Sequence, residues 1–326
     1  MQIQANKLRE LMELMKPVMP RKATLKVVNY IRLGDGKAVA TDLETMVIYD
    51  LPEATEPMLL PYASLADTQK YIPGNALIKI EAQEKKLSLA WDGGTAGYPT
   101  EDVADFPTLQ EVAPRAEAQM NGDALVPAMA AVLPYVATDE ARPVLTGVTM
   151  VLGSPVEVAA GDGFTMSHQV LGLSFPAEET IIIPARSVYI LGHVFAKTPR
   201  TPPSTAGTLV EVITAKRLLH VALIGENKVR FDLGTSASVI VNLIQGSPPS
   251  WLALIPKGDP ILQSQLFAPQ LEAAVKRVRN IAKDGSGIVR MEFAGGKLTV
   301  SARGEEQEIS AMIDTLNTQG EPGRTA

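Results

Sequence analysis

The chain has 326 residues, 46% of them apolar and 20% charged, with a formal net charge of −6. This length predicts two or three domains, and the negative charge excludes a nucleic-acid binder that is basic over its whole surface, but not one with a local basic patch. Cysteine is absent and no two of the three histidines stand at metal-ligand spacing, which excludes disulfides, thiolate metal sites and cysteine nucleophiles.

The N-terminal segment, residues 1–16, is charged and has periodically spaced apolar residues, as in an amphipathic helix. It lacks the apolar core and the small-residue cleavage site of a signal peptide. No run in the chain reaches the roughly 18 apolar residues that a membrane span needs. We therefore expect a cytoplasmic protein without a membrane partner.

Strand-like alternation follows in residues 26–33, 37–41 and 45–51. Gly34-Asp35-Gly36 separates the first two runs and predicts a tight turn between antiparallel strands. Asp42 and Glu44 stand two residues apart before the third run. They are either a pair of catalytic carboxylates or a bend between two strands.

The same order of features recurs about 120 residues later. Asp42 corresponds to Asp162, and Pro61, at the end of an apolar strand and the start of a helix, corresponds to Pro184. An earlier helix also recurs, from Asn6 and again from Asp123. A repeat of this length indicates a duplicated domain rather than a solenoid unit.

The duplication bears on the two carboxylates at the bend. Asp42 recurs as Asp162, whereas Glu44 is replaced by Phe164. If the two carboxylates were a catalytic pair, we would not expect the second copy to keep one of them and lose the other. We therefore interpret the aspartate as a turn residue whose side chain accepts backbone N–H groups. An enzyme using these carboxylates remains an alternative, and it predicts a shared pocket with raised carboxylate pKa values.

A third, partial copy occupies residues 268–316: a helix over 268–283, a strand, a Gly-Gly turn, a strand, a bend and a strand. Where the other copies begin a helix headed by proline, this one has the polar tail 317–326. The sequence therefore predicts an α+β fold of two complete copies and one partial copy. The expected domains are residues 1–118, 119–257 and 258–326.

Short motifs in these copies resemble one family. They are ATDLE (40–44), ADFPTL (104–109), RPVLTGV (142–148), AAGDGFTMS (159–167) and GSPPSWLALIP (246–256). The chain resembles the bacterial sliding clamp, the beta subunit of DNA polymerase III, with a shortened third domain. The resemblance implies a DNA processivity factor: a head-to-tail ring of two subunits around duplex DNA, with helices lining the hole. It implies the replicative polymerase and the clamp loader as partners, sequence-independent phosphate contacts, no enzymatic activity, and no cofactor or metal.

Basic residues in three regions are the candidates for DNA contact. In the helix over 268–283, apolar residues repeat at helical spacing on one face and bases lie opposite or on the flanks. The alternative for this helix is an ordinary solvated face. The resemblance implies further contacts in the loop after the first helix and at a matching basic position of the second copy. The candidates are Arg21, Lys22, Arg142, Lys276, Arg277, Arg279 and Lys283.

The resemblance also implies a groove between the second and third domains that binds partner peptides of the Gln-x-x-Leu-Phe type. The family pattern at 161–166, Thr-Asp-Gly-His-Arg-Leu, is Gly-Asp-Gly-Phe-Thr-Met in this chain, so two polar or charged groups are lost. The remainder of the family's groove comes from a C-terminal segment that this sequence lacks. The matching positions are Leu145, Gly161, Gly163, Phe164, Thr165, Met166, Pro249, Ala253 and Leu254.

The resemblance places the subunit contact between an edge strand of the first domain and the third domain of the neighbour. The matching positions are Ala96 and Tyr98 in the first domain, and Asn280 and Ile281 in the third. Ala96, Gly97 and Asn280 reduce the apolar area that is usual there, so we expect a weaker contact. The alternative function is a clamp paralogue that binds other proteins without encircling DNA.

Two other stretches have a structural and a functional interpretation. QSQLF (263–267) looks like a clamp-binding peptide but falls where the third copy needs its first strand. Trp91 and Trp251 are expected to pack in the core or at its rim rather than form a ligand cage. The stretch 197–207 is expected to be a loop.

Overall fold

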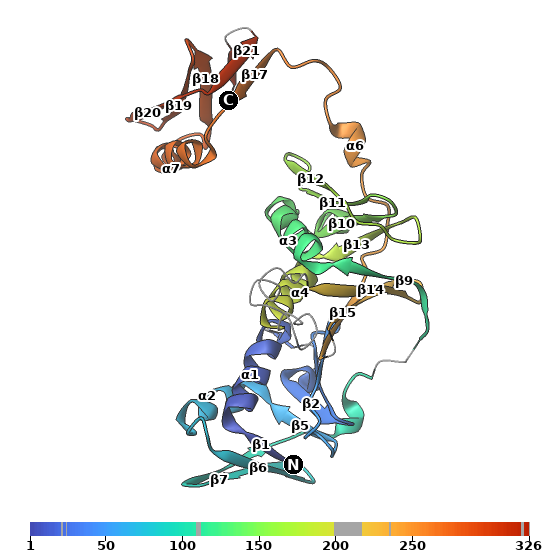
Figure 1. The fold of residues 1–326 in the computed structure, drawn as a ribbon. Helices are drawn as coiled ribbons and strands as arrows, with labels where there is room; N and C mark the ends of the chain where they lie inside the picture. Colours follow the sequence, from blue (N-terminus) through green and yellow to red (C-terminus); the bar gives the residue numbers. More distant parts are fainter. Residues whose placement is uncertain are drawn as a thin grey trace, which may run out of the picture. The chain divides into compact units, whose positions relative to one another are not determined.

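The structure is a computed structural model of the chain, and it describes residues 1–20, 22–23, 25–108, 112–198, 217–234, 236–320 and 323–325. The chain divides into two compact units, Met1–Trp251 and Leu252–Ala326. Figure 1 shows the chain coloured along the sequence, and each unit is described below by itself.

The first copy of the repeat contains eight strands and two α-helices. Its first expected strand differs from the prediction: Lys26–Asn29 form a 3-10 turn, and the strand begins at Tyr30. The elements are β1 (Gln2–Gln4), α1 (Ala5–Met15), η1 (Lys16–Val18), η2 (Lys26–Asn29), β2 (Tyr30–Gly34), β3 (Lys37–Thr41), β4 (Thr45–Asp50), β5 (Met58–Pro61), α2 (Tyr62–Thr68), η3 (Gln69–Tyr71), β6 (Leu77–Gln83), β7 (Lys86–Trp91), β8 (Gly94–Pro99) and η4 (Val103–Asp105).

The second copy repeats this order from strand to strand. Its elements are β9 (Pro114–Asn121), α3 (Gly122–Val132), η5 (Leu133–Tyr135), η6 (Pro143–Leu145), β10 (Gly147–Leu152), β11 (Val156–Gly161), β12 (Met166–Leu171), β13 (Glu179–Pro184), α4 (Ala185–Lys197), β14 (Leu218–Ile224), β15 (Lys228–Leu233) and β16 (Ala237–Asn242). The repeat that the sequence predicted is therefore present in the order of the elements. Most of the stretch 197–207 lies outside the described residues.

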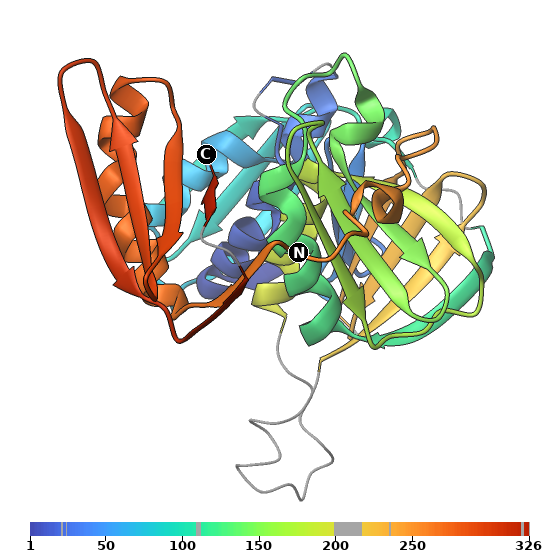
Figure 2. The same ribbon diagram turned by 90° about the horizontal axis from the view of Figure 1, so that it is seen from above.

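An eight-stranded antiparallel sheet joins the two copies, in the order β5-β2-β3-β4-β16-β15-β14-β9. The joint is the pair β4 and β16, where Val47 lies opposite Val239. One apolar core runs through both copies and includes Phe231 and Met15, each fully buried. Helices α1, α3 and α4 lie together on one side of the strands (Figure 2). This continuous sheet and core explain why Met1–Trp251 forms one compact unit.

The hairpin between β2 and β3 has the tight turn that the sequence predicted. Leu33 lies opposite Ala38, so Asp35 and Gly36 form a two-residue turn. Their φ angles are 57° and 70°. Two positive φ values match the right-handed twist of the strands, and glycine adopts this conformation without steric cost.

The second unit contains the partial copy. The predicted helix is present, and Ala274, Val278 and Ala282 form its buried stripe against the sheet. The tail, which the sequence analysis described only as polar, contains two short strands, β21 and β22, and β21 pairs with β17. The elements are α6 (Trp251–Leu254), β17 (Leu262–Gln265), α7 (Ala268–Asp284), β18 (Val289–Ala294), β19 (Lys297–Arg303), β20 (Glu308–Asp314), β21 (Asn317–Gly320) and β22 (Gly323–Thr325).

Among the strands at the ends of sheets, which have a hydrogen-bonded neighbour on one side only, three match the strands of the internal joint. They are β8 in the order β1-β6-β7-β8, β12 in the order β12-β11-β10-β13, and β20 in the order β20-β19-β18-β22. β12 and β20 follow their copies' bends, as β4 does, and β8 ends its copy, as β16 does. β12 and β20 are therefore equivalent in position to β4, and β8 is equivalent to β16. β4 and β16 are the two strands that form the internal joint.

Candidate functional site

The bend at Asp42 shows what its carboxylate does. Asp42 Oδ1 accepts the backbone N–H groups of Glu44 and Thr45, at 3.2 and 2.8 Å. Oδ2 accepts the guanidinium Nε of Arg186, at 2.7 Å. The carboxylate is therefore occupied by turn amides and by an arginine of α4. The structural interpretation of Asp42 is confirmed, and Glu44 contacts it through the backbone N–H, with no hydrogen bond from its side chain.

The equivalent bend at Asp162 is built in the same way. Its Oδ1 accepts the backbone N–H groups of Phe164 and Thr165, at 2.8 and 2.7 Å. These two donors, that of Thr165 foremost, hold the pKa of Asp162 below its usual value because they stabilise the charged form. A catalytic acid needs a raised pKa, so this carboxylate is not poised to deliver protons.

We expect Asp162→Asn to reduce the dependence of stability on acid pH. Because the folded-state pKa is depressed, the stability that the carboxylate contributes is present above its unfolded pKa of about 3.9 and is lost as the pH falls through the folded value. Urea unfolding midpoints from neutral to acid pH should therefore fall less steeply in the variant than in the wild type. Glu44→Gln in the first-copy turn is the matched control, and an unchanged slope in Asp162→Asn would contradict the prediction.

Helix α7 carries the largest group of bases on any described helix. Its buried stripe turns the remaining surface to solvent, and the basic side chains on that surface are all exposed. Lys276 forms an ion pair with Glu272 one turn earlier, and no ion pair within 4.0 Å forms between the other bases and described residues. The bases are Lys276, Arg277, Arg279 and Lys283.

The other predicted DNA contacts lie in the first unit. Lys22 is exposed in the loop between η1 and η2, and Arg21 lies outside the described residues. Arg142 is exposed immediately before η6. Both described side chains are free of ion pairs with the described part of the chain, so their charge is available to an anionic ligand.

The helices of the first unit differ from α7 because their charges balance. The guanidinium of Arg9 donates to the carbonyl oxygens of Gln69 and Ile72, and Lys7 pairs with Glu53. Helices α1 to α4 carry the bases Lys7, Arg9, Arg186 and Lys197 and the acids Glu10, Glu13, Asp67 and Asp123. In this unit the helical surface therefore has little unpaired positive charge.

The predicted peptide groove has an apolar base in the first unit. Leu145, Ala159 and Trp251 form a small buried cluster, with Met166 packed against it. Gly161 touches the same tryptophan: a Cβ at this position would lie 2.7 Å from the indole ring. The packing role predicted for Trp251 is confirmed, and Trp91 also packs against the main core.

The remaining groove positions are more exposed. Phe164, at the tip of the bend, is 97% exposed. Gly163 has a φ of 95°, which suits glycine, and Thr165 is exposed beside it. Pro249 is half-buried. Ala253 and Leu254 are exposed and belong to the second unit, so the structure brings together only the first-unit part of the predicted groove.

The predicted subunit-contact residues lie on an edge strand and on α7. Ala96 and Tyr98 in β8 are half-buried and pack against the core. The Tyr98 hydroxyl is buried without a hydrogen-bond partner in the described structure. On α7, Asn280 is exposed and Ile281 is half-buried.

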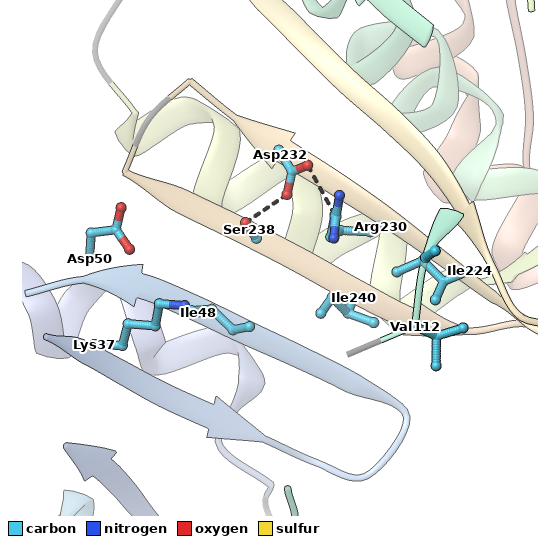
Figure 3. Close-up of a pocket in the computed structure, with 10 residues that line it drawn as sticks. Lys37, Ile48, Asp50, Val112, Ile224, Arg230, Asp232, Ser238 and Ile240 are labelled. Atoms are coloured by element: carbon cyan, nitrogen blue, oxygen red, sulfur yellow. Dashed lines mark hydrogen bonds and ion pairs between the residues drawn. The ribbon is translucent and has the colours of Figure 1, made fainter. Parts of the chain in front are cut away.

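A pocket of about 560 Å³ on the outer face of the eight-stranded sheet was not predicted (Figure 3). Ile48 and Ile240 lie along the pocket, and two of its charged side chains, Arg230 and Asp232, pair with each other. Asp232 accepts Arg230 Nε at 3.0 Å and Ser238 Oγ at 2.7 Å. These residues come from strands of both copies, so no local sequence pattern could have indicated the pocket.

The comparisons with known proteins show a likeness to beta sliding clamps. The beta sliding clamp of Pseudomonas putida is 24% identical over 332 residues, which cover 98% of this chain and 84% of that protein. The beta sliding clamp homolog GriR of Streptomyces muensis is 23% identical over 274 residues, 82% of this chain and 67% of that protein. The crystal structure of the DNA polymerase III subunit beta from Pseudomonas aeruginosa matches with a TM-score of 0.82 at 20% identity, covering 99% of this chain and 86% of that one.

The chain is similar in sequence to beta sliding clamps over nearly its whole length and has the clamp fold. No family model matches it. The α+β clamp fold predicted from the motifs is confirmed. The curated relatives are named as sliding clamps, which agrees with the prediction that the chain is not an enzyme.

The described residues lack two further kinds of feature. Within the described ranges, no three or more histidine and carboxylate side chains are grouped so that they could hold a metal ion. No helix in those ranges combines the length and the apolar character that crossing a membrane requires.

Proposed function

We propose that the chain is a cytoplasmic DNA sliding clamp that encircles duplex DNA as a head-to-tail ring of two subunits and tethers the replicative polymerase. The observation that carries the proposal is the exposed basic surface of α7, where Arg277, Arg279 and Lys283 form no ion pair with described residues, on a chain similar to beta sliding clamps. The proposed domains are residues 1–118, 119–257 and 258–326.

Sliding requires contacts that hold the duplex without reading its bases. Flexible lysine and arginine side chains on a solvated helix bind phosphate oxygens of any sequence, and each contact is weak and quickly exchanged. Lys22 and Arg142 are exposed and add charge from the first unit. Arg21 is proposed for the same role from its place in the sequence alone.

The direct test is retention on circular DNA. The chain is loaded onto a nicked circular duplex by a clamp loader and ATP, and the complex is separated by gel filtration in moderate salt. We expect retention that is lost when the circle is linearised, because a topological link disappears at a free end. Equal release from circular and linear DNA would contradict the ring.

The subunit contact is proposed to join β8, with Ala96 and Tyr98, to the β20 edge and α7 of the neighbour, near Asn280 and Ile281. The internal joint of β4 and β16 supports it, because β20 and β8 are the equivalent strands. Light scattering across a concentration series should give a mass near twice 34.9 kDa. Ala96→Lys should shift it towards one subunit, since a charge then faces the joint, and Thr95→Lys, whose side chain is exposed, is the control.

The partner groove is proposed to take an apolar side chain of a polymerase or clamp-loader peptide over Leu145, Met166 and Trp251. Their packing into one cluster supports this site. The other proposed groove residues are Gly161, Gly163, Phe164, Thr165, Pro249, Ala253 and Leu254.

A second candidate is a clamp paralogue that binds proteins without encircling DNA. The balanced charge of helices α1 to α4 favours it, because a neutral surface attracts phosphate poorly. It predicts peptide binding with no retention on circular DNA, so the same gel-filtration experiment separates the two functions.

A further inference from the structure

One arginine of the second copy forms three hydrogen bonds with the first copy. Arg186, the second residue of α4, donates from Nε to Asp42 Oδ2 at 2.7 Å. Its Nη2 donates to the carbonyl oxygens of Pro17 and Met19, at 3.0 and 3.2 Å. The carboxylate and the two carbonyls form a socket that accepts three hydrogen bonds from a guanidinium, and the planar fork of arginine suits such a set.

The second copy contains the same socket. Asp162 stands at the same bend as Asp42. In both, the backbone N–H donates to the carbonyl oxygen of the residue three positions later, at 3.2 Å, and Oδ1 accepts two turn amides. Pro134 and Val136 match Pro17 and Met19, because η5 and η1 have proline at the second position and close by the same hydrogen bond.

The socket of the second copy has no arginine from the described residues of the first unit. Among those residues, none donates to Asp162 Oδ2 and no base lies within 4.0 Å of the carboxylate. The carbonyl oxygens of Pro134 and Val136 also lack described donors. Beside the socket, strand β12 is an open edge, whereas β4, its equivalent, pairs with β16.

We propose that Asp162, Pro134 and Val136 bind an arginine of a second polypeptide, presented at the head of a helix that follows a strand, as Arg186 is presented at the head of α4. The proposal goes beyond the clamp function and depends neither on ring closure nor on DNA. It also differs from the apolar peptide groove nearby, because it takes a cation. The depressed pKa of Asp162 agrees with this role, since the carboxylate stays charged.

The arginine does not come from the first copy of another subunit. In that copy Pro61 and α2 match Pro184 and α4, and the position of Arg186 is occupied by Ala63. The third copy has no such socket, because Gly304 stands at the position of Asp42. Its backbone N–H donates to the carbonyl oxygen of Gln307, three residues later, as that of Asp42 donates to Thr45. A joint between third and first copies therefore needs no arginine, whereas the Asp162 socket requires a different partner.

Arg142 belongs to the chain itself and lies near the socket, so its contribution has to be distinguished from that of a partner's arginine. Its Nη1 lies 3.2 Å from the place of a Cβ on Gly163, but it forms no ion pair with Asp162. The first copy has Leu25 at the equivalent position before η2. Arg142→Leu therefore gives the second copy the same surroundings as the first, without touching the socket.

The test uses the full chain and L-argininamide as the probe, followed by NMR through the amide signals of Phe164 and Thr165. We expect a saturable shift in the wild type, about tenfold weaker binding in Asp162→Asn, and little effect of L-lysinamide, which cannot donate to three acceptors in one plane. Asparagine keeps an oxygen for the turn amides, so the bend is retained. Arg186→Ala is the positive control, because it opens the first socket and should shift Glu44 and Thr45.

Three results would overturn the proposal. The first is no shift at Phe164 and Thr165 at probe concentrations that saturate the opened Asp42 socket. The second is an equal response to L-lysinamide. The third is binding that appears only in Arg142→Leu, since the chain's own arginine would then fill the socket. None of these results affects retention on circular DNA, so the clamp proposal is judged separately.

Discussion

Replacing Lys276, Arg277, Arg279 and Lys283 by glutamine should weaken the affinity for duplex DNA and flatten its dependence on salt. Each base that contacts a phosphate adds about 0.9 to the slope of log affinity against log salt, so the four together add about 3.6 per subunit. A fourfold rise in salt then weakens the wild type about 150-fold more than the variant. The measurement is duplex binding by fluorescence anisotropy over a salt series.

The matched control removes the same number of charges away from α7. Lys37, Lys85, Lys86 and Lys228 lie on strands and turns of the first unit, and neutralising them should leave the salt slope close to that of the wild type. Circular dichroism and the unfolding midpoint establish that both variants fold. Equal slopes for the α7 variant and the wild type would show that the basic surface is only a solvated helix face.

Arg186→Met should lower the free energy of unfolding by about 2–3 kcal/mol. The change removes three hydrogen bonds and leaves the Asp42 carboxylate, whose side chain is 6% exposed, without its counter-ion. Breaking a buried pair by removing one partner costs about 3–5 kcal/mol, and the estimate is smaller here because the Arg186 side chain is 41% exposed. Urea unfolding of the full chain measures the loss.

Arg186→Lys is the informative control for this prediction. Lysine restores the positive charge but not the planar fork, so it should recover only part of the stability. The double variant Arg186→Met with Asp42→Asn should be more stable than Arg186→Met alone, because the uncompensated carboxylate is gone. If Arg186→Met lowered the free energy of unfolding by less than about 0.5 kcal/mol, the Arg186–Asp42 pair would contribute no more to stability than an exposed surface ion pair, and the prediction would be wrong.

Several features of the fold were predictable because they depend on short-range chemistry. Asp35-Gly36 forms the expected turn since glycine tolerates a positive φ. Asp42 and Asp162 cap their bends because the side chain reaches amides two and three residues ahead. Helix α7 buries Ala274, Val278 and Ala282, as the spacing of its apolar residues indicated.

Other features were missed where local patterns were ambiguous. Residues 26–29 have strand-like composition, yet they form a 3-10 turn that buries Val27 and Val28 before the strand begins. The tail after residue 316 has glycine, proline and polar residues typical of a loop. It nevertheless contains β21, because the first strand of the third copy, β17, has an edge to pair with. Both outcomes depend on neighbours that are remote in the sequence.

The sequence by itself determined the duplication, the role of the bend aspartates, the basic helix and the likeness to sliding clamps, because each is written in local spacing or in short motifs. Only the tertiary structure revealed that Arg186 meets Asp42 across 144 residues and that the equivalent Asp162 has no such arginine among the described residues of the first unit. A pairing of this kind depends on how two copies pack together. One arginine at the head of a helix carries no periodicity or motif from which that contact could be predicted.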